Sequence, residues 1–283
     1  MRARKINRST RGTVLLLIIL LFFAAYMILP VVLAIGNSLK PLNELWEFPP
    51  RLIPKEPTLK NFGDMFNIMS GSLVPFSRYF FNTILITVVG TAGNLLFSAM
   101  CAYQLEKKIF PGSRMIFKVI EMTLMFNATV TAIPCYIVMA KLQWIDSYFA
   151  LIVPTFASSL GLYLIKQFME TSVPDTLIEA ASIDGAGQWK TFWNIVLPCV
   201  RPALLTQMLL SVQSLWNLGT STYIFSDEKK TLSYALGQIV SGGVARAGVG
   251  AAVVVFMMVV PITIFIICQN NILDTMSTSG LKE

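Results

Sequence analysis

Few residues of this chain are able to do covalent or acid–base chemistry. The 283 residues include no histidine, so the commonest general base and metal ligand is missing. No glycine-rich loop is followed by Gly-Lys-Ser/Thr, so the signature of a nucleotide phosphate site is also missing. The four cysteines do not show the paired spacing of a zinc site or a disulfide framework; they are Cys101, Cys135, Cys199 and Cys268. We therefore expect a protein that is not an enzyme and that binds no metal or cofactor itself.

The most informative acidic residues lie in a run of small residues that begins at Glu179. The chain from Pro174 to Ile183 is expected to form a short helix, because proline suits the first helical position and acidic residues favour its positive end. Gly185 and Gly187 should then end that helix. Such a helix offers carboxylates for contact with a partner and contains no group suited to catalysis.

A second short helix is expected directly after these glycines. Trp189, Phe192, Trp193 and Val196 follow the i, i+3, i+4, i+7 spacing of an apolar stripe, and Pro198 should stop or kink the helix. The sequence thus predicts a helix-turn-helix knob in a polar interruption between two apolar segments.

The run EAASIDGAGQWKTFWNIVLPCVRP from Glu179 to Pro202 resembles the EAA loop of permease subunits of binding-protein-dependent ABC importers. The resemblance implies that the knob docks on a cytoplasmic ATPase and moves with it, and that ATP and Mg²⁺ bind to that ATPase. The residues that it assigns to coupling are Glu179, Ala180, Ala181, Asp184, Gly185, Ile195, Leu197 and Pro198. The alternative is an ordinary amphipathic helix pair, in which Asp184 caps a helix.

Composition independently indicates an integral membrane protein. Hydrophobic residues make up 55% of the chain and charged residues only 13%, and the mean hydropathy is +0.66. The net charge of +7 comes from basic residues that gather at the ends of apolar segments. This pattern is typical of membrane orientation, so we expect a lipid bilayer and no nucleic acid among the partners.

Six apolar segments are long enough to cross a hydrocarbon core of about 30 Å, so an all-α protein with six transmembrane helices is predicted. The segments are Thr13 to Ile35, Tyr79 to Tyr103, Ile116 to Ala140, Ser147 to Met169, Ala203 to Phe225, and Val249 to Cys268. The first could instead be a secretory signal, but its apolar run exceeds the usual 7 to 15 residues. A retained anchor is therefore preferred.

The distribution of positive charge predicts the orientation of these segments. Short loops rich in Lys and Arg stay in the cytoplasm, which places both termini there. Residues 1–12 then form a cytoplasmic N-terminus and residues 13–283 the permease domain. Within that domain, 36–78 is expected to be an outer loop and 170–201 the cytoplasmic coupling loop.

Polar residues inside two of the apolar segments suggest a path for a hydroxyl-rich substrate. Gln213, Trp216, Asn217 and Thr220 would share one face of the fifth segment, and Asn127 and Thr131 lie in the third. Amides and hydroxyls can hydrogen-bond a sugar, and an aromatic ring can stack on it. Hydrogen bonding between helices is the alternative, since polar groups at membrane depth need partners in either case.

Beyond the loop, the chain resembles the maltose-type carbohydrate permeases over almost its full length. The resemblance rests on Leu59-Lys-Asn-Phe62, Phe110-Pro-Gly112 and Ser214-Leu-Trp-Asn217. It implies a type I importer subunit in a bacterial cell membrane that takes up a carbohydrate, with an oligosaccharide expected. The expected partners are a second permease, a cytoplasmic ATPase dimer and an extracytoplasmic sugar-binding protein.

Two other functions stay open. A permease for amino acids, polyamines or phosphate would be expected to carry a buried opposite charge in its spans. A stand-alone channel or secondary transporter would need an internal repeat or an intramembrane coupling carboxylate, and neither is clear in the sequence. A membrane enzyme is an even weaker alternative, because the sequence lacks histidine and paired carboxylates.

Overall fold

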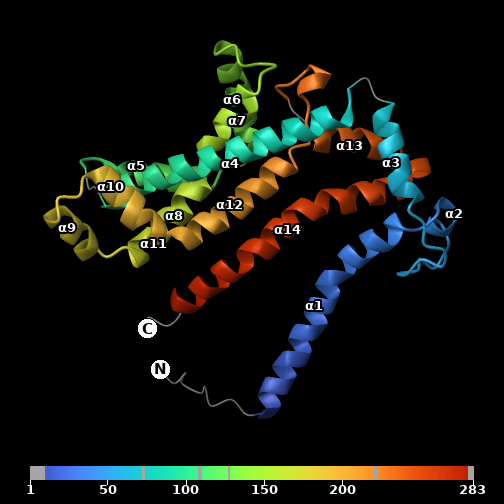
Figure 1. Cartoon of the computed structure of the whole chain (residues 1–283), viewed down its shortest axis with the longest axis horizontal. Helices are drawn as coiled ribbons and strands as arrows, with labels where there is room; N and C mark the ends of the chain where they lie inside the picture. The colour runs from blue at the N-terminus through green and yellow to red at the C-terminus, as the bar shows by residue number, and fades with distance from the viewer. Residues whose placement is uncertain (1–9, 72–73, 108–109, 127, 220–221, 280–283) are drawn as a thin grey trace. The chain divides into compact units, whose positions relative to one another are not determined.

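The computed structural model describes residues 10–71, 74–107, 110–126, 128–219 and 222–279, and every regular element in them is a helix (Figure 1). The α-helices are α1 Thr10–Ser38, α2 Leu42–Leu45, α3 Lys60–Ser70, α4 Phe76–Lys107, α5 Ser113–Thr123, α6 Ala128–Lys141, α7 Phe149–Ile152, α8 Ser159–Ser172, α9 Asp175–Ile183, α10 Gln188–Thr191, α11 Leu197–Cys199, α12 Arg201–Trp216, α13 Leu232–Val240 and α14 Ala247–Ser279. Shorter 3-10 or π turns are η1 Val153–Phe156, η2 Phe192–Val196, η3 Asp227–Lys229 and η4 Val244–Arg246.

The chain divides into two compact units, which are described separately. The first comprises Met1–Ile68 and Ile239–Phe256. Its irregular stretch after α1 is held by buried polar side chains: Lys40 is only 2% exposed, and its Nζ donates to Asn37 Oδ1 at 2.8 Å. Asn61 Nδ2 donates to the Ser38 carbonyl at 2.9 Å. Internal hydrogen bonds thus order this segment, which leads into α3.

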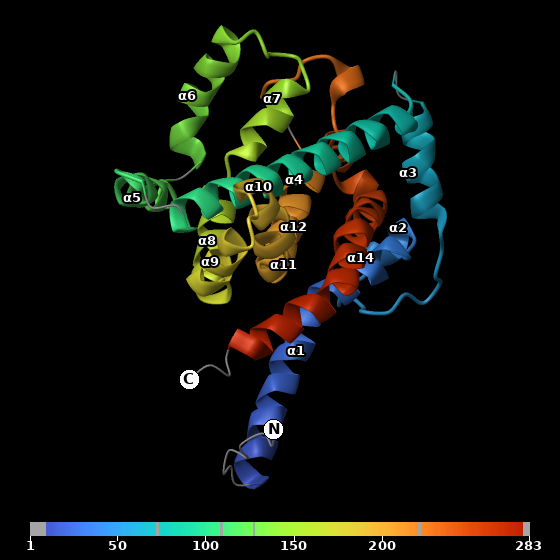
Figure 2. The ribbon, with the colours of Figure 1, turned by 60° about the vertical axis from the view of Figure 1, so that its left-hand side comes forward.

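The second unit comprises Met69–Gln238 and Met257–Glu283, and α4 is its central helix. Both α8 and α12 run along α4 (Figures 1 and 2). Glycines permit this close packing, because a Cβ on Gly90 would lie 2.7 Å from Leu215 Cδ1, and one on Gly93 only 2.1 Å from Phe156 Cε1. Small residues let membrane helices approach closely.

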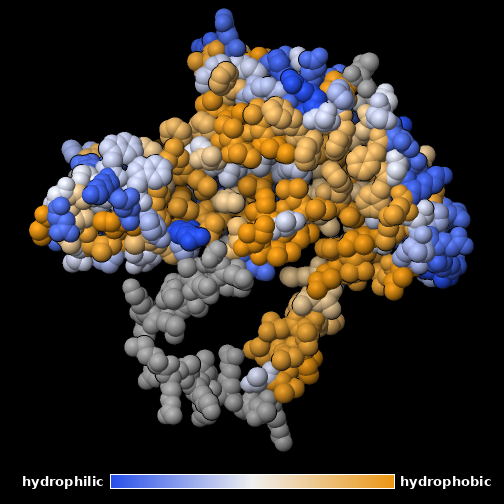
Figure 3. All heavy atoms as spheres, in the orientation of Figure 1, coloured by the Kyte–Doolittle hydropathy of each residue, from blue (hydrophilic) through white to orange (hydrophobic). Residues whose placement is uncertain are grey.

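Four helical stretches among the described residues are long and apolar enough to cross a membrane. They are Gly12–Ser38, Phe76–Lys107, Phe149–Ser172 and Ala247–Gln269. A bent pair, Gln188–Cys199 with Arg201–Trp216, brings the number to five if it is counted as one span; the bend is 77°. The face drawn in Figure 3 is largely hydrophobic along the middle of the long helices of the second unit, and more hydrophilic around α9 and α10.

Two predicted spans are wrong as continuous helices. The predicted span Ile116 to Ala140 is broken, since α5 ends at Thr123 and α6 begins at Ala128. The polar face of α5 explains the break, because Lys118 and Glu121 would be costly inside a bilayer. The remaining apolar helix, α6, has only 14 residues.

The fifth predicted span, Ala203 to Phe225, also ends early. Its helix stops at Trp216, and Asn217 is the C-terminal cap, with φ −89° and ψ 10°. The apolar segment in the sequence continues beyond Trp216, so hydropathy alone did not indicate where the helix ends. The predicted helical face that runs from Gln213 is therefore wrong at Asn217, where the helix ends.

Candidate coupling loop and polar helix contacts

The first helix of the predicted knob is α9. It begins one residue after Pro174, which is its N-cap in extended conformation. Lys107 Nζ at the end of α4 lies 2.8 Å from Asp175 Oδ1 in the first turn of α9, and the Lys107 side chain is only 5% exposed. This ion pair joins the start of the knob to the central helix.

The turn after α9 depends on Gly185. Its φ is +73°, in the left-handed region that costs least for glycine. The Ala186 N–H donates to the Ala181 carbonyl at 2.9 Å, and the Gly185 N–H donates to the Ser182 carbonyl at 3.1 Å. These bonds close the C-terminal end of the helix in the manner of a Schellman motif.

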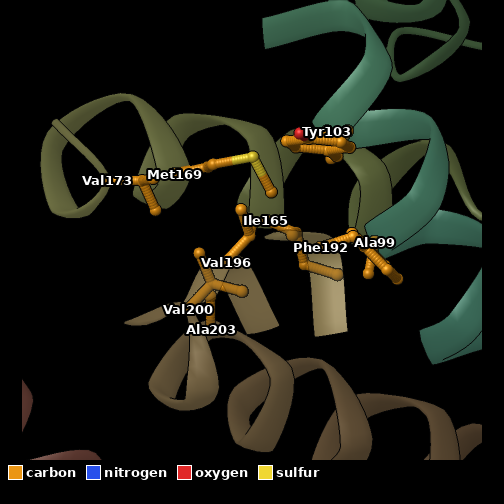
Figure 4. Close-up of a cluster of buried hydrophobic side chains, with 10 residues drawn as sticks. Ala99, Tyr103, Ile165, Met169, Val173, Phe192, Val196, Val200 and Ala203 are labelled. Atoms are coloured by element: carbon orange, nitrogen blue, oxygen red, sulfur yellow. The ribbon is translucent and has the colours of Figure 1, made fainter. Parts of the chain in front are cut away.

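The knob is anchored by a cluster of buried apolar side chains (Figure 4). Phe192 and Val196 of the knob pack in one cluster with Tyr103 of α4 and with Ile165 and Met169 of α8. The Phe192 and Tyr103 ring centroids are 5.5 Å apart. Apolar burial therefore fixes the inner side of the knob to two long helices.

The second helix of the knob departs from the predicted single stripe. Phe192 and Val196 are buried, whereas Trp189 is 64% and Trp193 is 51% exposed. A π turn, η2, interrupts the α-helix between α10 and α11. The wider turn changes the angle between successive residues, so the four side chains do not fall on one face.

The outer side of the knob presents an acid and an aliphatic side chain together on α9. Glu179, Ala180 and Asp184 are exposed, and Ile183 is 86% exposed. Ala181 is instead 6% exposed and belongs to the inner side. The other predicted coupling residues are the exposed Gly185 and Pro198 and the half-buried Ile195 and Leu197.

The predicted path residues occupy different environments. Gln213 and Asn217 are exposed at the end of α12, and Asn217 Nδ2 donates to the Gln213 carbonyl at 2.8 Å. Trp216 is only 3% exposed, and its indole Nε1 donates to the Met257 carbonyl at 3.0 Å. Thr131 lies in α6. Asn127 and Thr220 lie outside the described residues.

The sequence did not indicate that the carboxylate of Asp146 joins two loops, a contact called here the ionic tie. Asp146 follows α6, and its Oδ1 accepts from the backbone N–H groups of Phe225 at 3.1 Å and Ser226 at 3.0 Å. Its Oδ2 accepts from Ser226 Oγ at 2.5 Å and lies 3.2 Å from Lys229 Nζ. The hydrogen bonds from Ser226 hold the pKa of Asp146 well below the usual range. The partners are 80 residues apart, so no local signal marks them.

A second missed feature is a line of buried and half-buried polar residues between the long helices, called here the polar seam. Gln207 Nε2 of α12 donates to Asn94 Oδ1 of α4 at 2.9 Å. Asn94 Nδ2 donates in turn to the Thr155 carbonyl at 2.6 Å. The seam consists of Thr87, Thr91, Asn94 and Ser98 on α4, Thr155 and Ser158 beside α8, and Gln207 and Ser211 on α12. The i, i+4, i+7, i+11 spacing on α4 was the available signal.

These features occur in a chain whose residues 3–276 match the family described as "Binding-protein-dependent transport system inner membrane component". The chain belongs to this family. The permease is therefore a membrane transport subunit and not an enzyme. The solved structure of a bacterial ABC transporter involved in the import of the acidic polysaccharide alginate has a chain with the same fold, at a TM-score of 0.76 and 23% identity. The similarity covers 95% of the permease and 98% of that chain, which identifies the type I ABC permease fold.

Relatives of known name resemble the permease at moderate identity. The sn-glycerol-3-phosphate transport system permease protein UgpE of Yersinia enterocolitica is 33% identical over 176 residues, which is 62% of each chain. The permease thus spans less than two thirds of that relative's length. The arabinooligosaccharides transport system permease protein AraQ of Bacillus subtilis is 26% identical over 98% of the permease and 99% of AraQ.

Proposed function

We propose that the permease forms one half of the translocation pathway of an ATP-driven oligosaccharide importer, and that it works by alternating access. Its helices would open the pathway to one side of the membrane and then to the other. Each ligand or nucleotide biases this equilibrium only through its different affinity for the two states. ATP and Mg²⁺ would bind to a separate ATPase dimer.

The observation that carries this proposal is the knob of residues 173–200. It is fixed on its inner side by the Phe192 cluster, and on its outer side it presents Glu179 and Ile183 to a partner. The chain has no nucleotide-binding signature, so energy from ATP would have to enter by contact. A rigid projection that is anchored to the long helices is suited to transmit a movement of the ATPase to them. We assign the ATPase-coupling role to this knob, which resembles the coupling helix of importer permeases.

A second permease and the lipid bilayer would cover the exposed apolar helices. None of the membrane-crossing window of α1 is buried within the structure. A bilayer or a neighbouring helix must cover such a surface, because the exposure of so much apolar surface to water is unfavourable. We count six spans by adding α6, together with the residues that flank it, to the four long stretches and the bent pair. Both termini and the loop 170–201 would face the cytoplasm, and the loop 36–78 would face outward.

The uncharged polar side chains at the end of α12 and the names of two relatives favour one class of substrate. AraQ is named for arabinooligosaccharides and UgpE for sn-glycerol-3-phosphate. Gln213 and Asn217 are exposed and uncharged, which suits the hydroxyl groups of a neutral saccharide. A phosphate ester would favour a cationic partner near the path. We therefore favour a neutral oligosaccharide, delivered by an external sugar-binding protein.

The proposal is tested by reconstitution. The permease, a second permease, the ATPase dimer and the sugar-binding protein from the same genome would be assembled in vesicles, and uptake of neutral oligosaccharides and of glycerol 3-phosphate would be compared. We expect ATP-dependent uptake of a neutral oligosaccharide only. Uptake of the phosphate ester alone would change the substrate class, and uptake that needs neither ATP nor the other subunits would contradict the importer.

A further inference from the structure

The short helix α5 runs beside a membrane-crossing stretch. The Phe117 ring stacks on the Tyr163 ring of α8, with centroids 6.1 Å apart. Thr123 Oγ1 donates to Ser159 Oγ of α8 at 2.7 Å. Later residues of α5 therefore meet earlier residues of α8, so the two helices are antiparallel. Both partners on α8 belong to the candidate span Phe149–Ser172, and Tyr163 lies about 14 Å from the C-terminal end of that span. This part of α5 thus lies within the depth of the span.

The rotation of α5 is fixed by one stripe of side chains that packs inward. Ser113, Phe117 and Ile120 follow the i, i+4, i+7 spacing of one side of a helix. Ser113 is 5% exposed, and the other two are half-buried. Lys166 Nζ of α8 also lies 4.5 Å from the centroid of the Phe117 ring. The other sides of α5 are therefore turned away from α8.

Two further stripes of α5 have the same spacing, are exposed and differ in their chemistry. The first, called here the polar stripe, consists of Arg114, Lys118 and Glu121. The second, called here the apolar stripe, consists of Met115, Val119 and Met122, which are 74%, 51% and 54% exposed. In the described part of the chain, no residue of the polar stripe forms an ion pair. The charges of this stripe therefore need solvation from outside the chain.

We infer that the polar stripe of α5 lines a water-filled part of the translocation path, and that the apolar stripe faces lipid acyl chains. A charged side chain at membrane depth is costly against lipid but is tolerated where it lines a wet cavity. Methionine and valine side chains have the opposite preference. The helix α5 thus forms part of the wall between the bilayer and the path. This inference rests on the proposed transport function, because it adds residues to the path of that importer.

The charges of the polar stripe suit a neutral solute that is rich in hydroxyl groups. The Lys118 ammonium donates hydrogen bonds and the Glu121 carboxylate accepts them, so the two together can bind neighbouring sugar hydroxyls. A phosphate or carboxylate on the solute would be repelled by Glu121.

The segment that contains α5 and α6 also reaches the proposed path at α12. The Tyr136 ring of α6 stacks on the Tyr223 ring, with centroids 6.1 Å apart. Tyr223 follows Asn217, which is exposed at the end of α12. This contact brings α6 next to the part of the chain that follows the proposed path residue Asn217.

Thiol labelling compares the two exposed stripes at one depth. In the assembled importer, with the four native cysteines replaced by serine, Glu121→Cys and Met122→Cys are treated with a negatively charged, membrane-impermeant methanethiosulfonate. The reactive thiolate forms in water and not against lipid, so Glu121→Cys should react about tenfold faster than its neighbour. Unfolding in detergent should then make both thiols equally reactive. Equal rates in the assembled importer would overturn the inference, and slow labelling of both is the result expected if the second permease covers the polar stripe.

A second pair of variants repeats the comparison nearer the start of α5. Lys118→Cys should be labelled about tenfold faster than Val119→Cys, for the same reason. This pair decides the matter if a variant of the first pair does not assemble. Equal rates here would likewise overturn the inference.

Contact between the polar stripe and the solute is tested by uptake. Lys118→Met should lower the uptake of neutral oligosaccharide about fivefold, as expected for the loss of one hydrogen bond, while ATPase retention is unchanged. Val119→Met is the matched control on the apolar stripe. Equal uptake by the two variants would remove the polar stripe from the path. Failure of the unsubstituted importer to take up sugar with ATP would instead contradict the proposed function, because the labelling rates do not depend on uptake.

Discussion

The carboxylate of Asp146 and residue Ser226 are joined by two hydrogen bonds, one to the Ser226 N–H and one to its hydroxyl. Asp146 also adopts a left-handed backbone conformation, with φ +59°, and its own N–H donates to the Tyr223 carbonyl at 2.7 Å. Backbone and side chain thus hold the same opposing loop. Asp146, in the loop that follows α6, is thus held to residues 223–226, although they are far apart in sequence.

This tie predicts a pH dependence of stability. Because the folded-state pKa of Asp146 is depressed, its contribution is fully present above the ordinary aspartate pKa of about 3.9 and is lost as pH falls toward the lower folded value. Asp146→Asn should destabilise the permease by about 1 to 2 kcal/mol at neutral pH. That difference from wild type should shrink in acid. Thermal unfolding of both proteins between pH 8 and pH 3 measures it, and a difference independent of pH would contradict the assignment.

The turn at Gly185 predicts a contrast between two neighbouring glycines. A Cβ at either Gly185 or Gly187 would meet no atom within 4 Å, so only backbone conformation distinguishes the two sites. Gly185→Ala should cost about 1 to 2 kcal/mol, because φ there is +73°. Gly187→Ala should be close to neutral, because φ is −67°. ATPase retention on the purified complex and thermal unfolding would be measured, and equal behaviour of the two variants would disprove this account of the turn.

The exposed acid of the knob should matter for partner contact and not for folding. Glu179→Lys reverses a solvent-exposed charge, so we expect normal insertion and yield but loss of most ATPase co-purification and uptake. Glu56→Lys reverses another exposed carboxylate, in the loop 36–78, and should leave ATPase binding unchanged. Retained ATPase binding and uptake in Glu179→Lys would remove Glu179 from the coupling surface.

The substrate path is tested at Asn217. Asn217→Leu should lower sugar uptake about fivefold, which corresponds to the loss of one hydrogen bond worth about 1 kcal/mol, while ATPase docking persists. Ser233→Ala is the control, because Ser233 Oγ donates to the Asn217 carbonyl at 3.3 Å without involving the amide side chain. If the two variants transport equally well, Asn217 does not line the path.

Close packing at Gly161 predicts a large effect of one methyl group. Gly161→Ala would place a Cβ 2.5 Å from Gln207 Nε2 and 3.1 Å from Ser158 Oγ, so the amide must move and the seam loses hydrogen bonds. We expect a loss of about 1 to 3 kcal/mol. Gly63→Ala in α3 meets no atom within 4 Å and should instead be neutral or stabilising by about 0.5 to 1 kcal/mol. Thermal unfolding of the two variants provides the comparison, and similar values would contradict the packing argument.

The sequence determined those features whose causes are local. The short helix α9 and the turn at Gly185 follow from proline and glycine residues within a few positions, and the structure confirms both of them. Mean hydropathy and apolar runs likewise indicated the membrane class and the long helices. Both depend on neighbouring residues alone, because burial in lipid is set by the composition of a segment.

Only the tertiary structure decided which polar groups meet. Gln207 and Asn94 are 113 residues apart, and Asp146 and Ser226 are 80 residues apart, so neither pair leaves a local pattern. The same holds for Trp216, which resembled a path residue but donates its indole N–H to Met257. Within an apolar span the side-chain pattern shows that a polar group needs a partner. Which partner it finds depends on how the helices pack, and packing is set by contacts along the whole chain.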